Sequence, residues 1–125
     1  MIKLVLKQCT PFKRTINLQT EQLVELVEKT LEDMKARDIV KIDVMEKTSI
    51  TDFMVICSGN STRHVKSIAE NMNTEIRKHD LKPIGIEGND VGEWALIDLG
   101  DVIVHVMTDD IRDLYQLEKL WSEED

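Results

Sequence analysis

Residues 92–107 read Gly-Glu-Trp-Ala-Leu-Ile-Asp-Leu-Gly-Asp-Val-Ile-Val-His-Val-Met, and this stretch decides the fold. Two alternating segments flank a Gly-Asp turn signal, which is the pattern of a β-hairpin. Whether the loop is Leu99-Gly100 or Gly100-Asp101, the assignment of faces is the same, because side chains alternate along a strand. The first face is aliphatic and is predicted to lie in the core: Ala95, Ile97, Leu99, Val102, Val104 and Val106. The second face is mixed, and we expect the function there: Trp94, Leu96, Asp98, Ile103, His105 and Met107.

The segments before the hairpin predict a helix and two strands. Apolar residues recur at helical spacing from Thr20 to Met34, with charged residues between them. Residues 39–44 follow as a strand. The continuous apolar run of residues 53–57 is typical of a central strand buried on both faces, and its Cys57 is expected to behave as a small hydrophobic residue.

The segments on either side of the hairpin complete the predicted fold. A second helix begins with an N-cap at Ser61 or Thr62, and residues 81–86 form a short strand that a proline places near a sheet edge. A last helix is expected from Asp109 or Asp110 onward. The order α-β-β-α-β-β-β-α predicts an α/β fold with a mixed five-stranded sheet covered by helices.

Length and composition bound the class of protein. The chain has 125 residues, enough for one domain with a substantial core, which we assign to residues 18–125. Residues 1–17 contain four basic residues and no acidic one, and we interpret them as a basic arm or an upstream extension. No stretch approaches the roughly 20 apolar residues of a membrane span, and a secretory pattern is missing. Two cysteines are too few for a disulfide framework, which favours a reducing cytoplasm.

The formal net charge of −8 bears on the choice of partner. An acidic surface is repelled by phosphate backbones, so we expect little direct contact with nucleic acid. The same surface attracts a basic protein. Acidity of this size also serves solubility alone, and the charge by itself does not choose between these two explanations.

The turn of residues 58–64, Ser-Gly-Asn-Ser-Thr-Arg-His, is a candidate phosphate site because it connects a strand to a helix. Arg63 and His64 add positive charge there. A single glycine does not make a phosphate-cradling loop, however, so an ordinary capped turn is the favoured interpretation.

An enzyme would need catalytic or metal-binding side chains in other arrangements than this sequence shows. A nucleotidyltransferase holds magnesium with two acids at alternate positions on one strand face, whereas Asp98 and Asp101 lie on either side of the hairpin turn. The three histidines lie in three different elements, without partners at metal-ligand spacing. His105 beside Trp94 and Asp98 could act as a general base, but a histidine hydrogen-bonded to an acid is more common. We therefore predict no catalytic residues, no metal and no cofactor.

The last helix carries more apolar positions than one buried stripe requires: Ile111, Leu114, Tyr115, Leu117, Leu120 and Trp121. Together with Trp94, the excess could form an exposed aromatic patch of the kind found at protein interfaces. Trp121 folded over the edge of the domain explains the pattern equally well.

Long ordered motifs carry a family resemblance over about residues 20–122. They are Asp38-Ile39-Val40, residues 49–59 (Ser-Ile-Thr-Asp-Phe-Met-Val-Ile-Cys-Ser-Gly), 61–66 (Ser-Thr-Arg-His-Val-Lys), 85–88 (Gly-Ile-Glu-Gly), 92–94 (Gly-Glu-Trp), 98–105 (Asp-Leu-Gly-Asp-Val-Ile-Val-His) and 112–121 (Arg-Asp-Leu-Tyr-Gln-Leu-Glu-Lys-Leu-Trp). In these motifs the chain resembles the Iojap family, whose bacterial members are the ribosomal silencing factors.

The resemblance implies a nucleotidyltransferase-like fold without that activity. It also implies binding to the large ribosomal subunit through ribosomal protein number fourteen, a small basic protein on the intersubunit face. Occupying that face would block the small subunit and repress translation in starvation or stationary phase. Assistance in large-subunit assembly is the role associated with organellar relatives.

We predict a partner-binding surface on the second hairpin face and the helix that follows it. Trp94 and Tyr115 would be apolar anchors, and Asp98 or Glu87 would meet basic side chains of the partner. The full predicted set is Glu87, Trp94, Asp98, His105, Met107, Arg112 and Tyr115. Two alternatives stay open: a large-subunit assembly factor, and a nucleotide-binding enzyme that uses the Gly59 turn with Asp98 and Asp101. The sequence also leaves open whether the chain forms a homodimer away from the ribosome.

Overall fold

The computed structural model describes residues 18–122, so the predicted basic arm, residues 1–17, lies outside the described residues. The elements are α2 (Leu18–Asp33), β1 (Arg37–Asp43), β2 (Phe53–Gly59), α3 (Thr62–Lys78), β3 (Gly85–Glu87), β4 (Trp94–Asp98), β5 (Val102–Thr108), α4 (Asp109–Tyr115) and α5 (Leu117–Ser122). This order matches the predicted one except at its end, where two short helices replace the single last helix.

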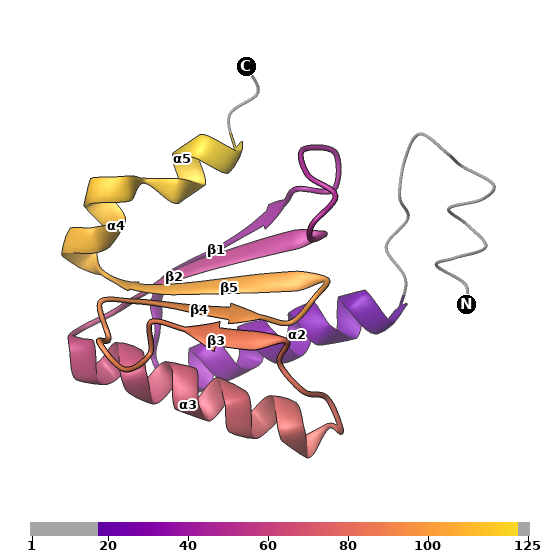
Figure 1. The fold of residues 1–125 in the computed structure, drawn as a ribbon, viewed down its shortest axis with the longest axis horizontal. Helices are drawn as coiled ribbons and strands as arrows, with labels where there is room; N and C mark the ends of the chain where they lie inside the picture. The colour runs from indigo at the N-terminus through magenta and orange to yellow at the C-terminus, as the bar shows by residue number, and fades with distance from the viewer. Residues whose placement is uncertain (1–17, 123–125) are drawn as a thin grey trace.

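The strands form one mixed sheet with helices on both faces (Figure 1). Its order is β1-β2-β5-β4-β3, in which β2 and β5 pair in parallel and the other neighbours pair antiparallel. Helices α2 and α3 lie on one face, which we call the inner face, and α4 and α5 lie on the outer face (Figure 1). The predicted mixed five-stranded sheet covered by helices is therefore confirmed.

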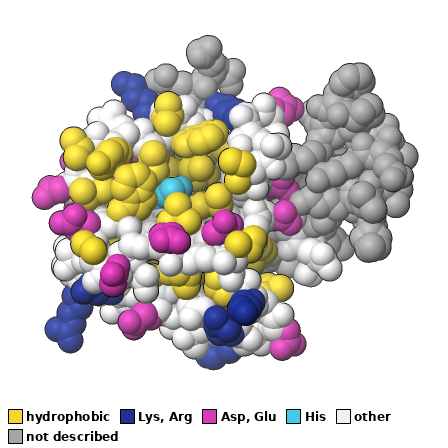
Figure 2. Space-filling view, viewed as in Figure 1, with side chains coloured by type: hydrophobic (Ala, Val, Ile, Leu, Met, Phe, Trp, Pro, Cys, Tyr) yellow, Lys and Arg dark blue, Asp and Glu magenta, His cyan; other side chains and the backbone are white. Residues whose placement is uncertain are grey.

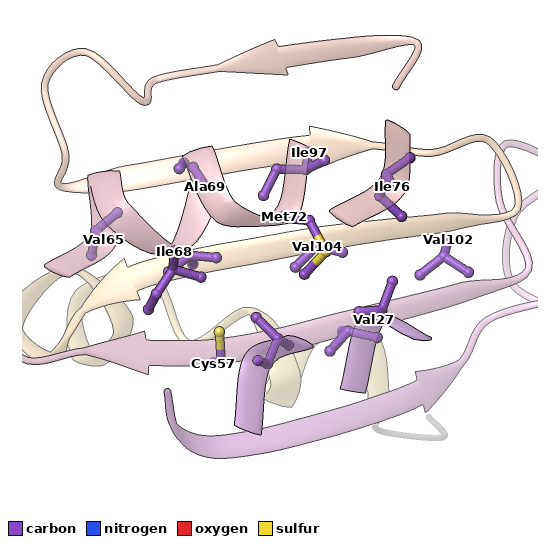
Figure 3. Packing of buried hydrophobic residues seen from close by; sticks show 14 of the residues in the cluster. Val27, Cys57, Val65, Ile68, Ala69, Met72, Ile76, Ile97, Val102 and Val104 are labelled. Atoms are coloured by element: carbon purple, nitrogen blue, oxygen red, sulfur yellow. The ribbon is translucent and has the colours of Figure 1, made fainter. Parts of the chain in front are cut away.

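The inner face holds the main core, shown in Figure 3. The aliphatic hairpin face predicted to be core is buried there, with Leu99 only partly so. The stripe of α3 that packs on it consists of Val65, Ile68, Ala69, Met72 and Ile76. Every residue of β2 is buried, as expected for a central strand. Burial raises the pKa of the Cys57 thiol to about 12, so this cysteine is an inert apolar residue as predicted.

The hairpin turn fixes the register between β4 and β5. The Leu99 N–H donates to the Val102 carbonyl at 2.9 Å, so the loop is Gly100-Asp101. Gly100 has a φ of 90°, which a two-residue hairpin turn requires at its first loop position. Asp98 consequently pairs with Ile103, and the two hairpin faces are those derived from the sequence.

The prediction of one continuous last helix is wrong. Gln116 adopts a left-handed conformation with a φ of 49°, and its N–H donates to the Arg112 carbonyl, which ends α4. This reversal lets α5 turn back over the outer face, where Leu117 and Trp121 pack on a second, smaller core. That core contains Ile42, Val44, Met54, Ile56 and Met107. Left-handed helix ends usually carry glycine or asparagine, so the glutamine gave no signal in the sequence.

Helices α4 and α5 cover only part of the outer face. Helix α5 lies against β1, while α4 lies against β5 and β2. The outer sides of β3 and β4 therefore lack a comparable helical cover among the described residues. The mixed face of the hairpin lies at this open part of the sheet.

Candidate docking surface

Two aromatic side chains mark the open part of the outer face. Trp94 begins β4 and is half-buried, whereas Tyr115, the last residue of α4, is 53% exposed. Their ring centroids lie 4.9 Å apart with planes inclined by 48°, a favourable tilted arrangement. Strand β4 and helix α4 thus build one aromatic pair from the two residues predicted as anchors.

Acidic and aliphatic residues continue this surface along the strands. Leu96 and Ile103 are half-buried on the same face as Trp94. Glu87 is exposed on β3 and pairs with Leu96 in the sheet register. The carboxylate of Asp98 accepts the Gly100 N–H at 2.9 Å, so it stabilises the turn while remaining partly exposed.

We define the candidate docking surface by these six residues: Glu87, Trp94, Leu96, Asp98, Ile103 and Tyr115. Figure 2 shows hydrophobic side chains gathered on this side of the molecule, with acidic side chains next to them. The predicted set of site residues omitted Leu96 and Ile103, although the alternation along the hairpin places both on the mixed face. An aliphatic residue on a half-open face looks the same in sequence as one that packs under a helix.

Gly88, in the loop between β3 and β4, packs closely against the start of β4 at Trp94. The loop between β3 and β4 passes directly over the backbone at Trp94, and Gly88 has a φ of 78° there. A Cβ atom at Gly88 would lie 2.1 Å from the Trp94 carbonyl oxygen, which is an impossible contact. Only glycine allows this approach, so the position of Trp94 depends on a residue that makes no side-chain contact.

His105 lies against Trp94 and is 6% exposed. Its Nδ1 accepts a hydrogen bond from the Trp94 indole Nε1–H at 3.0 Å. The expected acidic partner is therefore wrong, because the Asp98 carboxylate turns toward Gly100 instead. Burial lowers the pKa of His105 from 6.5 to about 4, so the imidazole is neutral at pH 7.

Two predicted site residues are buried in the structure. Met107 is fully buried in the small outer core, because α4 and α5 fold back over the end of β5. Arg112 is 8% exposed; its guanidinium donates to the Ser58 hydroxyl at 2.8 Å and to Glu118 at 2.9 Å. Arg112 therefore fastens α4 to the end of β2 and to α5, and its effect on the surface is to hold Tyr115 in place.

The strand-to-helix turn at Gly59 is filled by its own side chains. Ser61 caps α3 by accepting the His64 N–H, which confirms one of the two predicted caps. His64 Nδ1 accepts the Asn60 N–H at 2.8 Å, so its Nε2 is the protonated nitrogen that donates to the Met34 carbonyl. This network joins the turn to the end of α2 and matches an ordinary capped turn.

The two candidate metal-binding acids are engaged separately. The Asp98 carboxylate binds the Gly100 N–H, and the Asp101 carboxylate accepts the Thr20 hydroxyl at 2.9 Å. Within residues 18–122, no group of three or more histidine, cysteine or acidic side chains is placed to hold a metal ion. No helix in the same range is long and apolar enough to cross a membrane.

The fold is that of a small α/β protein, and its outer face carries a partly exposed aromatic pair beside acidic residues. A family model described as "ribosomal silencing factor during starvation" matches residues 17–125. The ribosomal silencing factor RsfS of Haemophilus influenzae is 48% identical over 100 residues, covering 80% of this chain and 98% of that protein. The chain belongs to the ribosomal silencing factor family, whose members are regulatory proteins rather than known enzymes.

A solved structure and a mitochondrial relative also resemble this chain. A crystal structure of a Chromobacterium violaceum protein superimposes with a TM-score of 0.80 at 35% identity, over 88% of this chain and 90% of that one. The mouse protein named "mitochondrial assembly of ribosomal large subunit protein 1" is 33% identical over 102 residues, which is 79% of this chain and 45% of that protein. The family thus includes proteins named for silencing and a protein named for large-subunit assembly.

Proposed function

We propose that this protein binds the large ribosomal subunit through ribosomal protein number fourteen and blocks joining of the small subunit. Translation would then be repressed in starvation or stationary phase, in the cytoplasm where the ribosomes work. The observation that carries the proposal is the pair of half-buried Trp94 and exposed Tyr115 beside Glu87 and Asp98. Aromatic side chains are typical anchors of protein interfaces, and the acids suit a basic partner.

Charge supports a protein partner over ribosomal RNA. The net charge of −8 opposes approach to a phosphate backbone, whereas a basic protein on the same particle offers a complementary landing site. Trp94 and Tyr115 supply apolar contact area in the centre, while Glu87 and Asp98 lie where a polar rim is expected. The two kinds of residue together favour a small basic protein.

Size supports the blocking mechanism. A specific interface needs about 800 Å² from each partner, a modest share of the 7662 Å² of accessible surface on this chain. The rest of the domain would project from the subunit surface. If the landing site lies on the intersubunit face, this bulk alone would prevent the small subunit from docking, and no chemical step would be needed.

Co-sedimentation with separated ribosomal subunits tests this proposal directly. The chain should travel with the large subunit and not with the small one, and adding the small subunit should then give fewer joined ribosomes than a control without the protein. Large subunits lacking ribosomal protein number fourteen should not retain the chain. Absence of the chain from the large-subunit fraction would remove the proposal. A chain that pairs with itself through the docking surface would show competition between dimer formation and subunit binding.

Large-subunit assembly is the second candidate function, favoured by the name of the mouse relative. An assembly factor should be enriched on precursor particles and leave before translation starts. A silencing factor should persist on mature large subunits. Sedimentation of extracts from growing and starved cells, with detection of the chain in each particle, distinguishes the two functions.

A further inference from the structure

His105 uses its two ring nitrogens in different ways. An indole N–H can only donate, so the 3.0 Å bond from Trp94 requires a lone pair on His105 Nδ1. A neutral imidazole then carries its proton on Nε2. The hydrogen-bond network thus selects one of the two neutral tautomers, and Nε2–H is a donor.

This donor has no partner in residues 18–122. His105 makes no other hydrogen bond in this range. Its Nε2 is also not one of the buried side-chain atoms that lack a hydrogen-bond partner, so Nε2 is not closed off from solvent. Nε2 therefore keeps access to solvent and accounts for part of the 6% of His105 that remains exposed. Figure 2 shows a histidine side chain surrounded by the hydrophobic area on this face.

The same ring also orients the aromatic pair above it. The His105 and Trp94 ring centroids lie 5.9 Å apart, and Trp94 in turn contacts Tyr115. Trp94 is only half-buried, so packing does not fully restrain it. Its hydrogen bond to a buried acceptor supplies the missing restraint on the indole.

We propose that His105 is a positioning residue for Trp94 and that its Nε2–H donates a hydrogen bond to a main-chain carbonyl of the bound protein. The side chains that make a protein basic, those of lysine and arginine, are donors without acceptors. They cannot receive this N–H, whereas a main-chain carbonyl can. The proposal rests on the proposed function and adds to it a polar contact at the floor of the docking surface.

Two variants of the full chain test the contact. His105→Phe keeps a ring but removes both nitrogens, whereas His105→Gln keeps an amide that can accept and donate. In co-sedimentation with large subunits, we expect His105→Phe to bind roughly tenfold more weakly, the size of one or two lost neutral hydrogen bonds, and His105→Gln to recover part of this loss. Thermal unfolding monitored by circular dichroism establishes that each variant is folded.

A spectroscopic measurement tests the positioning role independently of the ribosome. In a ¹⁵N spectrum of the free protein, the indole N–H signal of Trp94 should shift strongly in His105→Phe and little in His105→Gln, and Trp94→Phe assigns the signal. An unchanged Trp94 signal in His105→Phe would overturn the positioning role. Long-range ¹H–¹⁵N correlations of the wild-type imidazole should show the proton on Nε2, and a proton on Nδ1 would overturn the donor.

The outcomes separate this inference from the proposed function. If the wild-type chain does not bind large subunits, the proposed function fails, and the carbonyl contact fails with it. If the wild-type chain binds and a folded His105→Phe variant binds equally well, the contact is wrong while the proposed function stands. Partial rescue by glutamine supports the contact, since a purely structural loss of ring packing would not be restored by an amide.

Discussion

The two faces of the β4–β5 hairpin differ in almost every physical respect. On the inner face, the strand residues from Ala95 to Val106 are aliphatic and fully buried under α3. On the outer face, Trp94 and Leu96 are half-buried, and a neutral histidine lies among them. Both faces belong to the same two strands, so they differ only in their side chains and in the helices that cover them.

The two-residue period of a strand separates the residues that stabilise the fold from those that are available for recognition. Alternate residues of one strand contribute either to the core or to the exposed surface, and neighbours along the chain therefore play different roles. Mutations at adjacent positions should separate the two properties.

The largest effect is expected for Ile97→Ala on the inner face. Ile97 is fully buried, and removing its side chain leaves a cavity that should lower the free energy of unfolding by about 4 kcal/mol. Leu96→Ala, one residue earlier and half-buried on the outer face, should cost closer to 1 kcal/mol. Urea unfolding of both variants measures the difference. Equal losses would mean that the outer face is as much a core as the inner one.

Replacing the aromatic pair should affect binding far more than folding. Trp94→Ala combined with Tyr115→Ala should weaken binding to large subunits roughly 100-fold, about 3 kcal/mol, since both side chains are the expected hot spots. Ile50→Ala is a matched control, because Ile50 is 76% exposed in the loop between β1 and β2 and lies outside the docking surface. A folded double variant that binds like the wild type would show that the surface is wrongly placed.

His105 should make stability depend on pH. Its pKa is about 4 in the folded protein and about 6.5 unfolded, so below pH 6.5 the unfolded chain binds a proton that the folded chain does not. Stability from this group is complete above pH 6.5 and falls as the pH drops toward 4. Between pH 7 and pH 5 we expect a loss of about 2 kcal/mol in unfolding free energy. His105→Gln should remove this part of the dependence, and an unchanged slope would contradict the assignment.

The inner half of the molecule could be predicted from the sequence because burial there follows local patterns. The period-two aliphatic face, the apolar run of β2 and the helical stripe of α3 all lie in the core as expected. Each pattern needs only one partner surface to bury it. Any element that covers that face satisfies the pattern, so the details of the cover do not matter.

The outer half depended on contacts that the sequence does not encode locally. Met107 shares a face with Trp94, yet the turn at Gln116 brings α5 back and buries it. His105 was expected beside an acid, but the acid caps the hairpin turn and the indole takes its place. Arg112 was predicted to bind the partner, and in the structure its guanidinium is buried between Ser58 at the end of β2 and Glu118 of α5. These outcomes are set by the arrangement of distant elements.

The smallest effect is expected for a single rim charge. Glu87→Gln should lower the affinity for large subunits two- to threefold, mainly through slower association, because an exposed acid contributes long-range attraction rather than close contact. Glu25→Gln makes the same change of net charge on α2, on the other side of the sheet, and should have a smaller effect. The difference between the two variants should vanish as salt is raised, because exposed charges are screened within about 10 Å at 0.1 M salt. Association rates measured at several salt concentrations check this. Equal effects of the two substitutions would mean that only net charge matters, and that the outer face has no electrostatic advantage over the inner side.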